Sequence, residues 1–326
     1  MIKIGVVGIG SMGKNHVRVC SELESIDLVG ICDIDKKLTS RIATTFGTTA
    51  FSDYKTLIGK VDAVIVATPT ITHYKIAKDF LKAGKHVLVE KPISSTIEDG
   101  KELITLAEKD DMVLAVGHIE RHNPVVQFMK DAVQDKRFGQ LITLESKRVS
   151  NFPGRIKDIG VIFDLGIHDI DIMRYLAGEI KSVYATAGTF TKNIGFEDHA
   201  IIVLTFENGI CGVIEVNWLT PMKIRKLFLT CSGSFVEMDY MSQSITISSS
   251  SFKKVNELDL YHVPIESNIT QISLEKKEPL KNEIEDFIGA IQDTRKPLVS
   301  GADGLRALQI AAATEKSYKR GEVIIT

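Results

Sequence analysis

The sequence has few of the features that mark secreted, membrane-spanning or nucleic-acid-binding proteins. Four cysteines occur in 326 residues, and they are scattered without the short spacings of a metal site or a disulfide framework. No apolar run reaches the ~18 residues that a membrane-spanning helix needs. The formal net charge is −2, so the composition does not favour nucleic acid or an anionic membrane as a partner. We therefore expect no bound metal, no membrane span and no nucleic-acid partner.

The rest of the composition is that of an ordinary globular protein, with 44% hydrophobic and 25% charged residues. A chain of 326 residues exceeds the size at which one hydrophobic core stops growing, so two domains are expected. A strand predicted to begin at Ile2 leaves no room for a cleaved signal peptide. Together with the isolated cysteines, this predicts a cytoplasmic protein.

The strongest functional motif lies in the first 35 residues. A β-branched run at 2–7 predicts a strand buried in a parallel sheet. A helical pattern and a second predicted strand, which ends at Asp33, lie further along. Between the first strand and the helix is a G-x-G-x-x-G turn made of Gly8, Ile9, Gly10, Ser11, Met12 and Gly13.

Each position of this motif has a physical role in binding a dinucleotide. Gly8 allows a sharp turn, Gly10 leaves room for a pyrophosphate, and Gly13 lets the helix approach the sheet. The helix N-terminus offers N–H groups and partial positive charge to the anion. Asp33 follows Gly13 by 33 − 13 = 20 positions, as expected for the residue that binds the adenosine ribose. Because a carboxylate repels a 2′-phosphate, the motif predicts NAD in preference to NADP.

Apolar runs that predict strands alternate with amphipathic segments that predict helices up to about residue 120. This pattern predicts a doubly wound parallel (Rossmann) sheet, and a dinucleotide-binding domain at 1–120. Ligands on such sheets bind beyond the carboxyl ends of the strands. Thr68 follows the predicted strand 61–67, and Lys91 follows the predicted strand 86–89, so both should face the dinucleotide crevice.

A different pattern begins after this point and predicts a second α/β domain at 121–326. Predicted strands between 182 and 240 are joined by short connections, which indicates an open, mainly antiparallel sheet. Asn208-Gly209 between two of them is a strong hairpin signal. The serine run at 248–251 predicts an exposed turn.

Three polar residues share one face of a helix predicted from 163 to 176. Asp164, His168 and Asp171 lie at i, i+4 and i+7. A carboxylate one turn from an imidazole can orient it and stabilise its charged form, which makes the histidine a better base. A structural explanation also fits: Asp164 as a partner of the helix dipole, His168 as a hydrogen-bonded core histidine and Asp171 as a solvated acid.

Lys91 is an unusual residue for the end of a buried parallel strand unless its side chain points into the crevice. Pro92 forces Lys91 into an extended conformation, and the bond between them could be cis. On these residues alone, a catalytic lysine and a structural ion pair between Glu90 and a surface arginine explain the segment equally well.

Taken together, the motifs resemble those of the glucose–fructose oxidoreductase, inositol dehydrogenase and MocA family. The resemblance covers essentially the whole chain, and the order and spacing of four segments make it specific. These segments are the glycine turn, Thr68-Pro69-Thr70 with His73, Glu90-Lys91-Pro92, and the span from Asp164 to His168. It implies a dinucleotide-binding domain joined to an α/β domain that carries the substrate site on its open sheet. That sheet often forms the subunit interface, which implies a homodimer or homotetramer.

The resemblance also implies roles for individual residues. In the family's sugar dehydrogenases, the lysine of E-K-P and the aspartate and histidine of D-x-x-x-H form the catalytic group. Those positions match Lys91, Asp164 and His168. The implied cofactor contacts, besides the glycine turn and Asp33, are Thr68, Pro69, His73, Glu90 and Lys91.

Two further segments, 117–124 and 155–158, resemble a narrower group, the UDP-N-acetylglucosamine 3-dehydrogenases. Basic residues there suit a diphosphate, because an arginine fork binds such groups well; a solvated basic loop is the structural alternative. The predicted substrate-binding residues are Arg121, Arg148 and Arg155, beside Lys91, Asp164 and His168.

The predicted function is NAD-dependent oxidation of a ring hydroxyl of a sugar or nucleotide-sugar to a ketone. UDP-N-acetylglucosamine, oxidised at its 3-hydroxyl, is the substrate that the resemblance favours. Three alternatives stay open: dehydrogenation of an inositol or another free polyol, glycoside hydrolysis with transient use of NAD, and a non-enzymatic NAD-sensing regulator.

Overall fold

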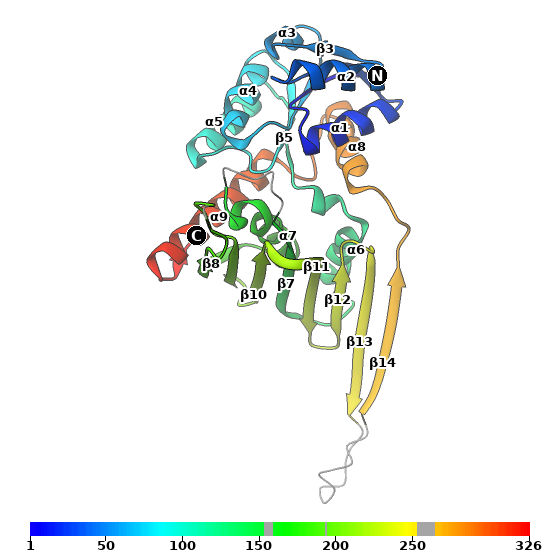
Figure 1. Cartoon of the computed structure of the whole chain (residues 1–326). Helices are drawn as coiled ribbons and strands as arrows, with labels where there is room; N and C mark the ends of the chain where they lie inside the picture. The colour runs from blue at the N-terminus through cyan, green and yellow to red at the C-terminus, as the bar shows by residue number, and fades with distance from the viewer. Residues whose placement is uncertain (153–158, 193, 253–264) are drawn as a thin grey trace, which may run out of the picture. The chain divides into compact units, whose positions relative to one another are not determined.

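The computed structural model describes the protein at residues 1–152, 159–192, 194–252 and 265–326. The chain forms two compact units, which Figure 1 shows by colour along the sequence. Unit 1 comprises residues 1–122 and 277–309, and unit 2 comprises residues 123–276 and 310–326. The first break therefore lies at residue 122, close to the boundary expected near 120.

The segment 277–309 departs from the predicted division of the chain, because it packs with unit 1 and not with the rest of 121–326. Within it, helix α8 (Pro279–Gln292) carries an apolar stripe that joins the hydrophobic core of unit 1. The stripe consists of Leu280, Ile284, Phe287 and Ile288. Helical spacing identifies an amphipathic helix in the sequence, but it does not say which sheet the helix covers.

Unit 1 is built on a six-stranded sheet in the order β3-β2-β1-β4-β5-β6, and every pair of neighbours is parallel. The order reverses between β1 and β4, the place where doubly wound sheets bind their ligands. The predicted Rossmann sheet is confirmed. Its strands are β1 (Ile2–Val7), β2 (Ile26–Cys32), β3 (Thr49–Phe51), β4 (Ala63–Val66), β5 (His86–Glu90) and β6 (Leu114–Gly117).

Helices cover both faces of this sheet. On one face, α1, α2 and α8 share a core with the strands, and α4 and α5 lie on the other (Figure 1). The start of α9 (Gly301–Arg320) also belongs to unit 1, where Gly304 packs against Val116 of β6. The helices of unit 1 not yet given are α1 (Ser11–Glu22), α2 (Lys36–Phe46), α3 (Lys55–Ile58), α4 (Thr70–Lys82), α5 (Ile97–Lys109) and the 3₁₀ turn η1 (Ile119–His122).

Unit 2 is built on a nine-stranded sheet in the order β14-β13-β12-β11-β7-β10-β9-β8-β15. Among the described strands of this sheet, only β7 and β10 pair in parallel, which confirms the expected open, mainly antiparallel sheet. Its strands are β7 (Leu141–Asn151), β8 (Ile180–Gly188), β9 (His199–Phe206), β10 (Cys211–Asn217), β11 (Leu219–Cys231), β12 (Phe235–Asp239), β13 (Ser244–Phe252), β14 (Ile265–Ser273) and β15 (Ile324–Ile325).

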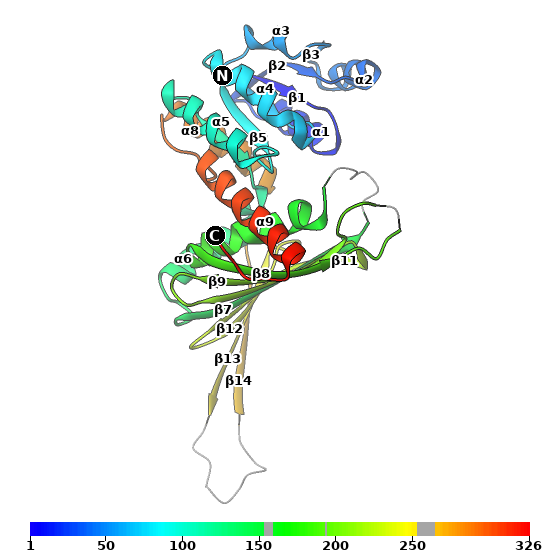
Figure 2. The ribbon, with the colours of Figure 1, turned by 90° about the vertical axis from the view of Figure 1, so that its left-hand side faces the viewer.

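Helices cover one face of the unit 2 sheet. Figure 2 shows α6 (Pro124–Gln134), α7 (Ile167–Ala177) and the end of α9 on the same side of the strands. The ammonium group of Lys130 on α6 donates to the carbonyl of Tyr175 on α7 at 2.5 Å. Along β9, buried and exposed residues alternate strictly, as expected for a strand with one covered and one open face.

The predicted turn at 248–251 is wrong, because these serines lie within β13. In the register with β14, Ser248 faces Ile269. Serine has low strand propensity, but pairing with a neighbouring strand overrides such local preferences. No helix in the described part of the chain is both long and apolar enough to cross a bilayer.

Candidate active site

The glycine turn lies between β1 and α1, as predicted. Gly8 has a φ of +91°, and a Cβ atom there would lie 2.5 Å from the carbonyl oxygen of Ala67. A Cβ atom on Gly13 would lie 1.8 Å from the carbonyl oxygen of Gly8, so only glycine lets α1 start this close to the strand. Beside Gly10, by contrast, a Cβ atom would meet no described atom within 4 Å. The turn therefore leaves open space where a pyrophosphate approaches the backbone.

Asp33 and the start of α1 provide the polar groups that are predicted to bind the ribose and the pyrophosphate. Gly10 precedes α1, and no described side chain caps the helix there, so its N-terminal N–H groups can serve an anion. The Asp33 carboxylate accepts from the backbone N–H of Ile9 at 2.6 Å and from that of Asp35 at 2.9 Å. Because an ionised carboxylate has about four acceptor positions, Asp33 can brace the turn and still bind ribose hydroxyls. These residues fit NAD.

His73 supports the loops that follow β4 and β5. Its ring is 1% exposed, with Nδ1 2.8 Å from the carbonyl oxygen of Pro92 and Nε2 2.8 Å from that of Thr68. Burial lowers the pKa of His73, whereas the two carbonyl contacts act in the opposite direction. Thr68 and Pro69, two predicted cofactor contacts, directly precede α4. The cofactor contact predicted for His73 stays a prediction; its burial means that the ring acts on these loops.

Lys91 directly follows β5, and the Lys91–Pro92 bond is cis. Among the residues that the structure describes, Glu90 pairs with a histidine and not with the arginine that the structural alternative required. Its Oε1 lies 2.8 Å from Nε2 of His16 on α1, and its Oε2 accepts from the backbone N–H of Lys91 at 3.3 Å. The sequence motifs did not single out His16 as a functional candidate. The available signal was a histidine at an otherwise apolar position.

Asp164 and His168 lie on a helical segment that differs from the single α-helix predicted from 163. Residues Ile162–Gly166 form a π-helical turn that contains Asp164, and α7 begins at Ile167, one residue before His168. Asp164 is 8% exposed. The π turn is wider than an α turn, so α-helical spacing does not describe how Asp164 faces His168. Single π turns occur frequently at functional sites.

The start of this segment is held by a residue distant in sequence. The carbonyl and carboxylate oxygens of Glu197 accept from the backbone N–H groups of Val161 and Ile162, at 3.0 and 3.2 Å. A Cβ atom on Gly160 would lie 2.0 Å from the Glu197 carboxylate, so a larger residue there would displace the Glu197 side chain. Burial raises the pKa of Glu197. These tertiary contacts shape the backbone before Asp164, which explains why local periodicity did not reveal the π turn.

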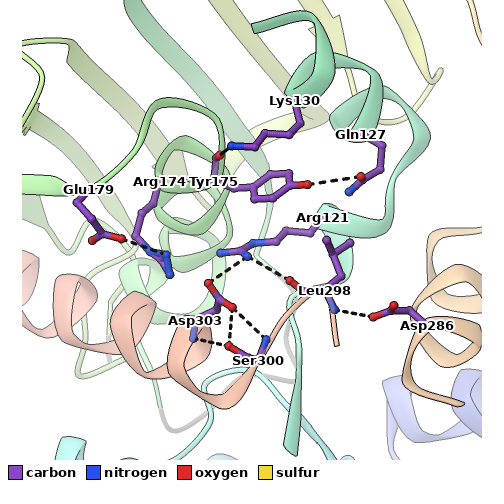
Figure 3. A network of polar contacts seen from close by, with 10 residues as sticks. All are labelled: Arg121, Gln127, Lys130, Arg174, Tyr175, Glu179, Asp286, Leu298, Ser300 and Asp303. Atoms are coloured by element: carbon purple, nitrogen blue, oxygen red, sulfur yellow. Dashed lines mark hydrogen bonds and ion pairs between the residues drawn. The ribbon is translucent and has the colours of Figure 1, made fainter. Parts of the chain in front are cut away.

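Arg121, a predicted substrate contact, is buried in unit 1 and 3% exposed. Figure 3 shows its Nη1 directed at the carboxylate of Asp303, 3.2 Å away, and at the carbonyl of Leu298, 3.4 Å away. Asp303 in turn accepts from the backbone N–H and the hydroxyl of Ser300. Arg121 therefore ties η1 to the start of α9, and its predicted substrate contact stays a prediction.

Arg148, on β7 of unit 2, is also buried, at 1% exposure. Its Nε donates to Asp169 of α7 at 2.7 Å, and its guanidinium carbon lies 5.0 Å from the ring centroid of Tyr240. This arrangement supports a structural role for Arg148, and its predicted substrate contact stays a prediction. Arg155 and Lys157 lie outside the described residues.

The predicted catalytic residues are divided between the units. Lys91 belongs to unit 1, whereas Asp164 and His168 belong to unit 2, so their meeting in one catalytic group stays a prediction. In unit 1, the glycine turn, Thr68 and Lys91 follow β1, β4 and β5, which are neighbours in the parallel sheet. They therefore share one edge. No cluster of metal-binding side chains occurs among the residues that the structure describes.

Comparison with known proteins identifies the family. Residues 2–118 match an oxidoreductase family with an NAD-binding Rossmann fold, and residues 126–235 match the GFO/IDH/MocA C-terminal domain. The protein belongs to the Gfo/Idh/MocA family of oxidoreductases. NAD is the cofactor, as predicted, and the contacts that the sequence predicts for the glycine turn and Asp33 stay predictions.

Several members of the family are similar to this one over their whole length. UDP-N-acetylglucosamine 3-dehydrogenase of Acidithiobacillus ferrooxidans is 30% identical, over 98% of this chain and 99% of that protein. Its solved structure matches with a TM-score of 0.85, covering 98% of each chain. Myo-inositol 2-dehydrogenase of Thermotoga maritima is 27% identical, over 98% of this chain and 96% of that protein.

Proposed function

We propose that this Gfo/Idh/MocA oxidoreductase oxidises a ring hydroxyl of a sugar or nucleotide-sugar to a ketone. One observation carries the proposal: Lys91 follows β5 on the same edge of the parallel sheet as the glycine turn that follows β1. A lysine at this edge supports the proposal, because an ammonium group near bound NAD would stabilise negative charge that develops on a substrate oxygen.

The proposed mechanism gives each catalytic residue one role. His168 removes the proton of the substrate hydroxyl, and Asp164 orients the imidazole and stabilises its charge. Lys91 donates to the same oxygen and stabilises the developing alkoxide. Bound NAD supplies the hydride acceptor. A positioned base contributes roughly 10²- to 10⁴-fold, and the rest of the acceleration comes from orientation of the substrate.

We propose UDP-N-acetylglucosamine as the substrate and its 3-hydroxyl as the group oxidised. The Acidithiobacillus relative that acts on this compound matches over nearly the whole of both chains. The segment with Arg155 and Lys157 adds basic residues that would suit a diphosphate. The second candidate is a free inositol, which the relatives named inositol dehydrogenases favour.

The proposal is tested by incubating the purified protein with NAD and either UDP-N-acetylglucosamine, other UDP-sugars or myo-inositol, while the absorbance of reduced nicotinamide is followed. We expect the reduced cofactor to accumulate with UDP-N-acetylglucosamine. Accumulation of the reduced cofactor only with myo-inositol would show that an inositol, and not UDP-N-acetylglucosamine, is the substrate. Consumption of a glycoside without net reduced cofactor would indicate hydrolysis, and NAD binding without any reaction would favour a sensor.

We also propose that the protein forms a homo-oligomer through the open face of the unit 2 sheet. This face carries exposed apolar side chains, including Tyr184, Ile201, Val203 and Val213, and large apolar patches on a surface mark interaction sites. Light scattering of the purified protein should give a dimer or tetramer mass, which Val203→Lys should reduce. A monomer mass for the unmodified protein would refute this proposal.

A further inference from the structure

Three ionisable side chains are buried together in unit 1, close to Lys91. His16 is 0% exposed and Glu283 is 2% exposed, whereas the Glu90 side chain is 12% exposed. They come from three elements that are far apart in sequence: α1, β5 and α8. None of these residues except Glu90 has a role in the proposed function.

The hydrogen bond between His16 and Glu90 connects the dinucleotide turn to the lysine. His16 lies on α1 one turn after Gly13, and its Nε2 is 2.8 Å from Oε1 of Glu90. The other carboxylate oxygen accepts from the backbone N–H of Lys91 at 3.3 Å. Gly117 on the neighbouring strand leaves room for this carboxylate, because a Cβ atom there would lie 3.0 Å from Oε2. The series of contacts from His16 on α1 through Glu90 to Lys91 is therefore continuous and closely packed.

Glu283 adds a second carboxyl group to the cluster. Neither of its oxygens has a hydrogen-bond partner among the described residues. Burial, together with the charges of Glu90 and Asp286, raises its pKa well above the ordinary value, which favours the protonated form. A neutral acid can lie near the Glu90 carboxylate without adding a second buried charge.

The other charged groups on the elements packed against α8 are exposed or paired, or lie on η1, and Lys14 of α1 is exposed. Arg18 on α1 forms ion pairs with Glu22 and Glu278, and Arg121 on η1 pairs with Asp303. The remaining ionisable residues of η1 are Glu120 and His122.

Stability does not explain why an acid and an imidazole are buried here. A buried ion pair is often no more stabilising than apolar side chains of the same volume, and polar groups that break the rule of an apolar core tend to occur at functional sites. We propose that His16 is a positioning residue for Lys91: it fixes the Glu90 carboxylate, which fixes the backbone of Lys91, so that α1 and the lysine are held together. This inference rests on the proposed function, in which Lys91 contacts the substrate.

The test compares two substitutions of His16 in the full-length protein. His16→Leu removes the donor to Glu90 at similar volume, and we expect kcat to fall about 10- to 100-fold, the loss typical of a misplaced catalytic group. His16→Gln keeps an N–H donor and should recover most of kcat. In both variants the NAD dissociation constant, measured by fluorescence titration, should change less than about threefold. Ser21→Ala, at an exposed position of α1, is the control.

A double-substitution cycle separates this inference from the proposed function. If His16 acts through Lys91, His16→Leu should lower kcat no further in a Lys91→Ala background, because residues that act as a unit are not additive. If His16→Leu lowers kcat by the same factor in the Lys91→Ala background, His16 does not act through Lys91. The proposed role of Lys91 would be unaffected by that result. Near-normal turnover of Lys91→Ala alone would refute the proposed function, and with it this inference.

Glu90→Gln provides a second route if His16→Leu does not fold. The amide keeps the shape of the side chain but weakens the contact with His16, so kcat should again fall while NAD binding is retained. Equal kcat values for Glu90→Gln and the unmodified protein would contradict the proposal. So would a His16→Gln variant with as little turnover as His16→Leu.

Discussion

Units 1 and 2 position their polar side chains in different ways. In unit 1, the candidate residues follow the ends of neighbouring parallel strands, so the topology of the sheet alone brings the glycine turn, Thr68 and Lys91 to one edge. In unit 2, Asp164 and His168 lie on one helical segment, and a remote residue, Glu197, anchors its start. Substitutions in unit 1 should therefore act on the cofactor and on Lys91, whereas substitutions near α7 should act on turnover or on the packing of the segment.

The largest effect is expected for the proposed general base of unit 2, His168. His168→Ala should lower kcat by roughly 10²- to 10⁴-fold, because a general base is lost, and should leave the dissociation constant of NAD nearly unchanged. Steady-state kinetics and fluorescence titration of NADH measure the two quantities. His199→Ala, at a half-exposed histidine of the same unit, is the control. Near-normal turnover of the His168→Ala enzyme would show that His168 is not the catalytic base.

Arg148→Met tests whether α7 depends on buried packing. The substitution leaves Asp169 as a buried carboxylate without its arginine, and breaking such a pair costs about 3–5 kcal/mol. Urea unfolding should show a loss of that size. The double variant Arg148→Met with Asp169→Leu removes both charges and should recover most of the loss. An undiminished free energy of unfolding in Arg148→Met would mean that the pair does not hold α7.

Asp33→Ala tests the adenosine side of unit 1. The carboxylate is expected to bind the ribose and to repel a 2′-phosphate, so its removal should lower the ratio of kcat/KM for NAD to that for NADP. A hydrogen bond to a charged group is worth about 1.5–3 kcal/mol, which corresponds to about tenfold or more. Asp35→Ala is a neighbouring control. If the ratio stays unchanged, the selectivity lies in other residues.

The smallest effect is a pH dependence at Glu283. Its raised pKa means that the folded protein keeps this proton to higher pH than the unfolded chain. Above the ordinary carboxyl pKa of 4.5, the unfolded chain ionises and the folded state loses stability as the pH rises. Glu283→Gln cannot ionise, so it should be more stable than the unmodified protein at about pH 8 and lose that advantage towards about pH 4.

Thermal unfolding over this pH range measures the difference. Glu285→Gln, at an exposed position of the same helix, should show no such trend. A stability difference between Glu283→Gln and the unmodified protein that does not vary with pH would show that Glu283 ionises normally in the folded state.

The contrast between the units also explains how much the sequence could predict. The glycine turn, Asp33 and the parallel sheet are local in sequence, and each motif carries its own geometry. The open sheet of unit 2 was also predictable, because its strands alternate in polarity. The placement of α8, the pairing of β13 with β14, the π turn and the Arg148–Asp169 pair depend on contacts between distant residues, which neither periodicity nor spacing encodes.

His16 could be predicted only in part from the sequence. Its position on the buried face of α1 was visible in the sequence, but its partner Glu90 is 90 − 16 = 74 residues away. Only the parallel order of β1, β4 and β5 brings the two side chains together.

The central claim is that an imidazole from unit 2 and an ammonium from unit 1 act on one hydroxyl beside NAD. A crystal structure of the protein with NAD and UDP-N-acetylglucosamine tests it most directly. We expect Nε2 or Nδ1 of His168 and Nζ of Lys91 each to lie within about 2.6–3.2 Å of the 3-hydroxyl oxygen. A bound sugar whose 3-hydroxyl lies beyond the reach of either group would contradict the account.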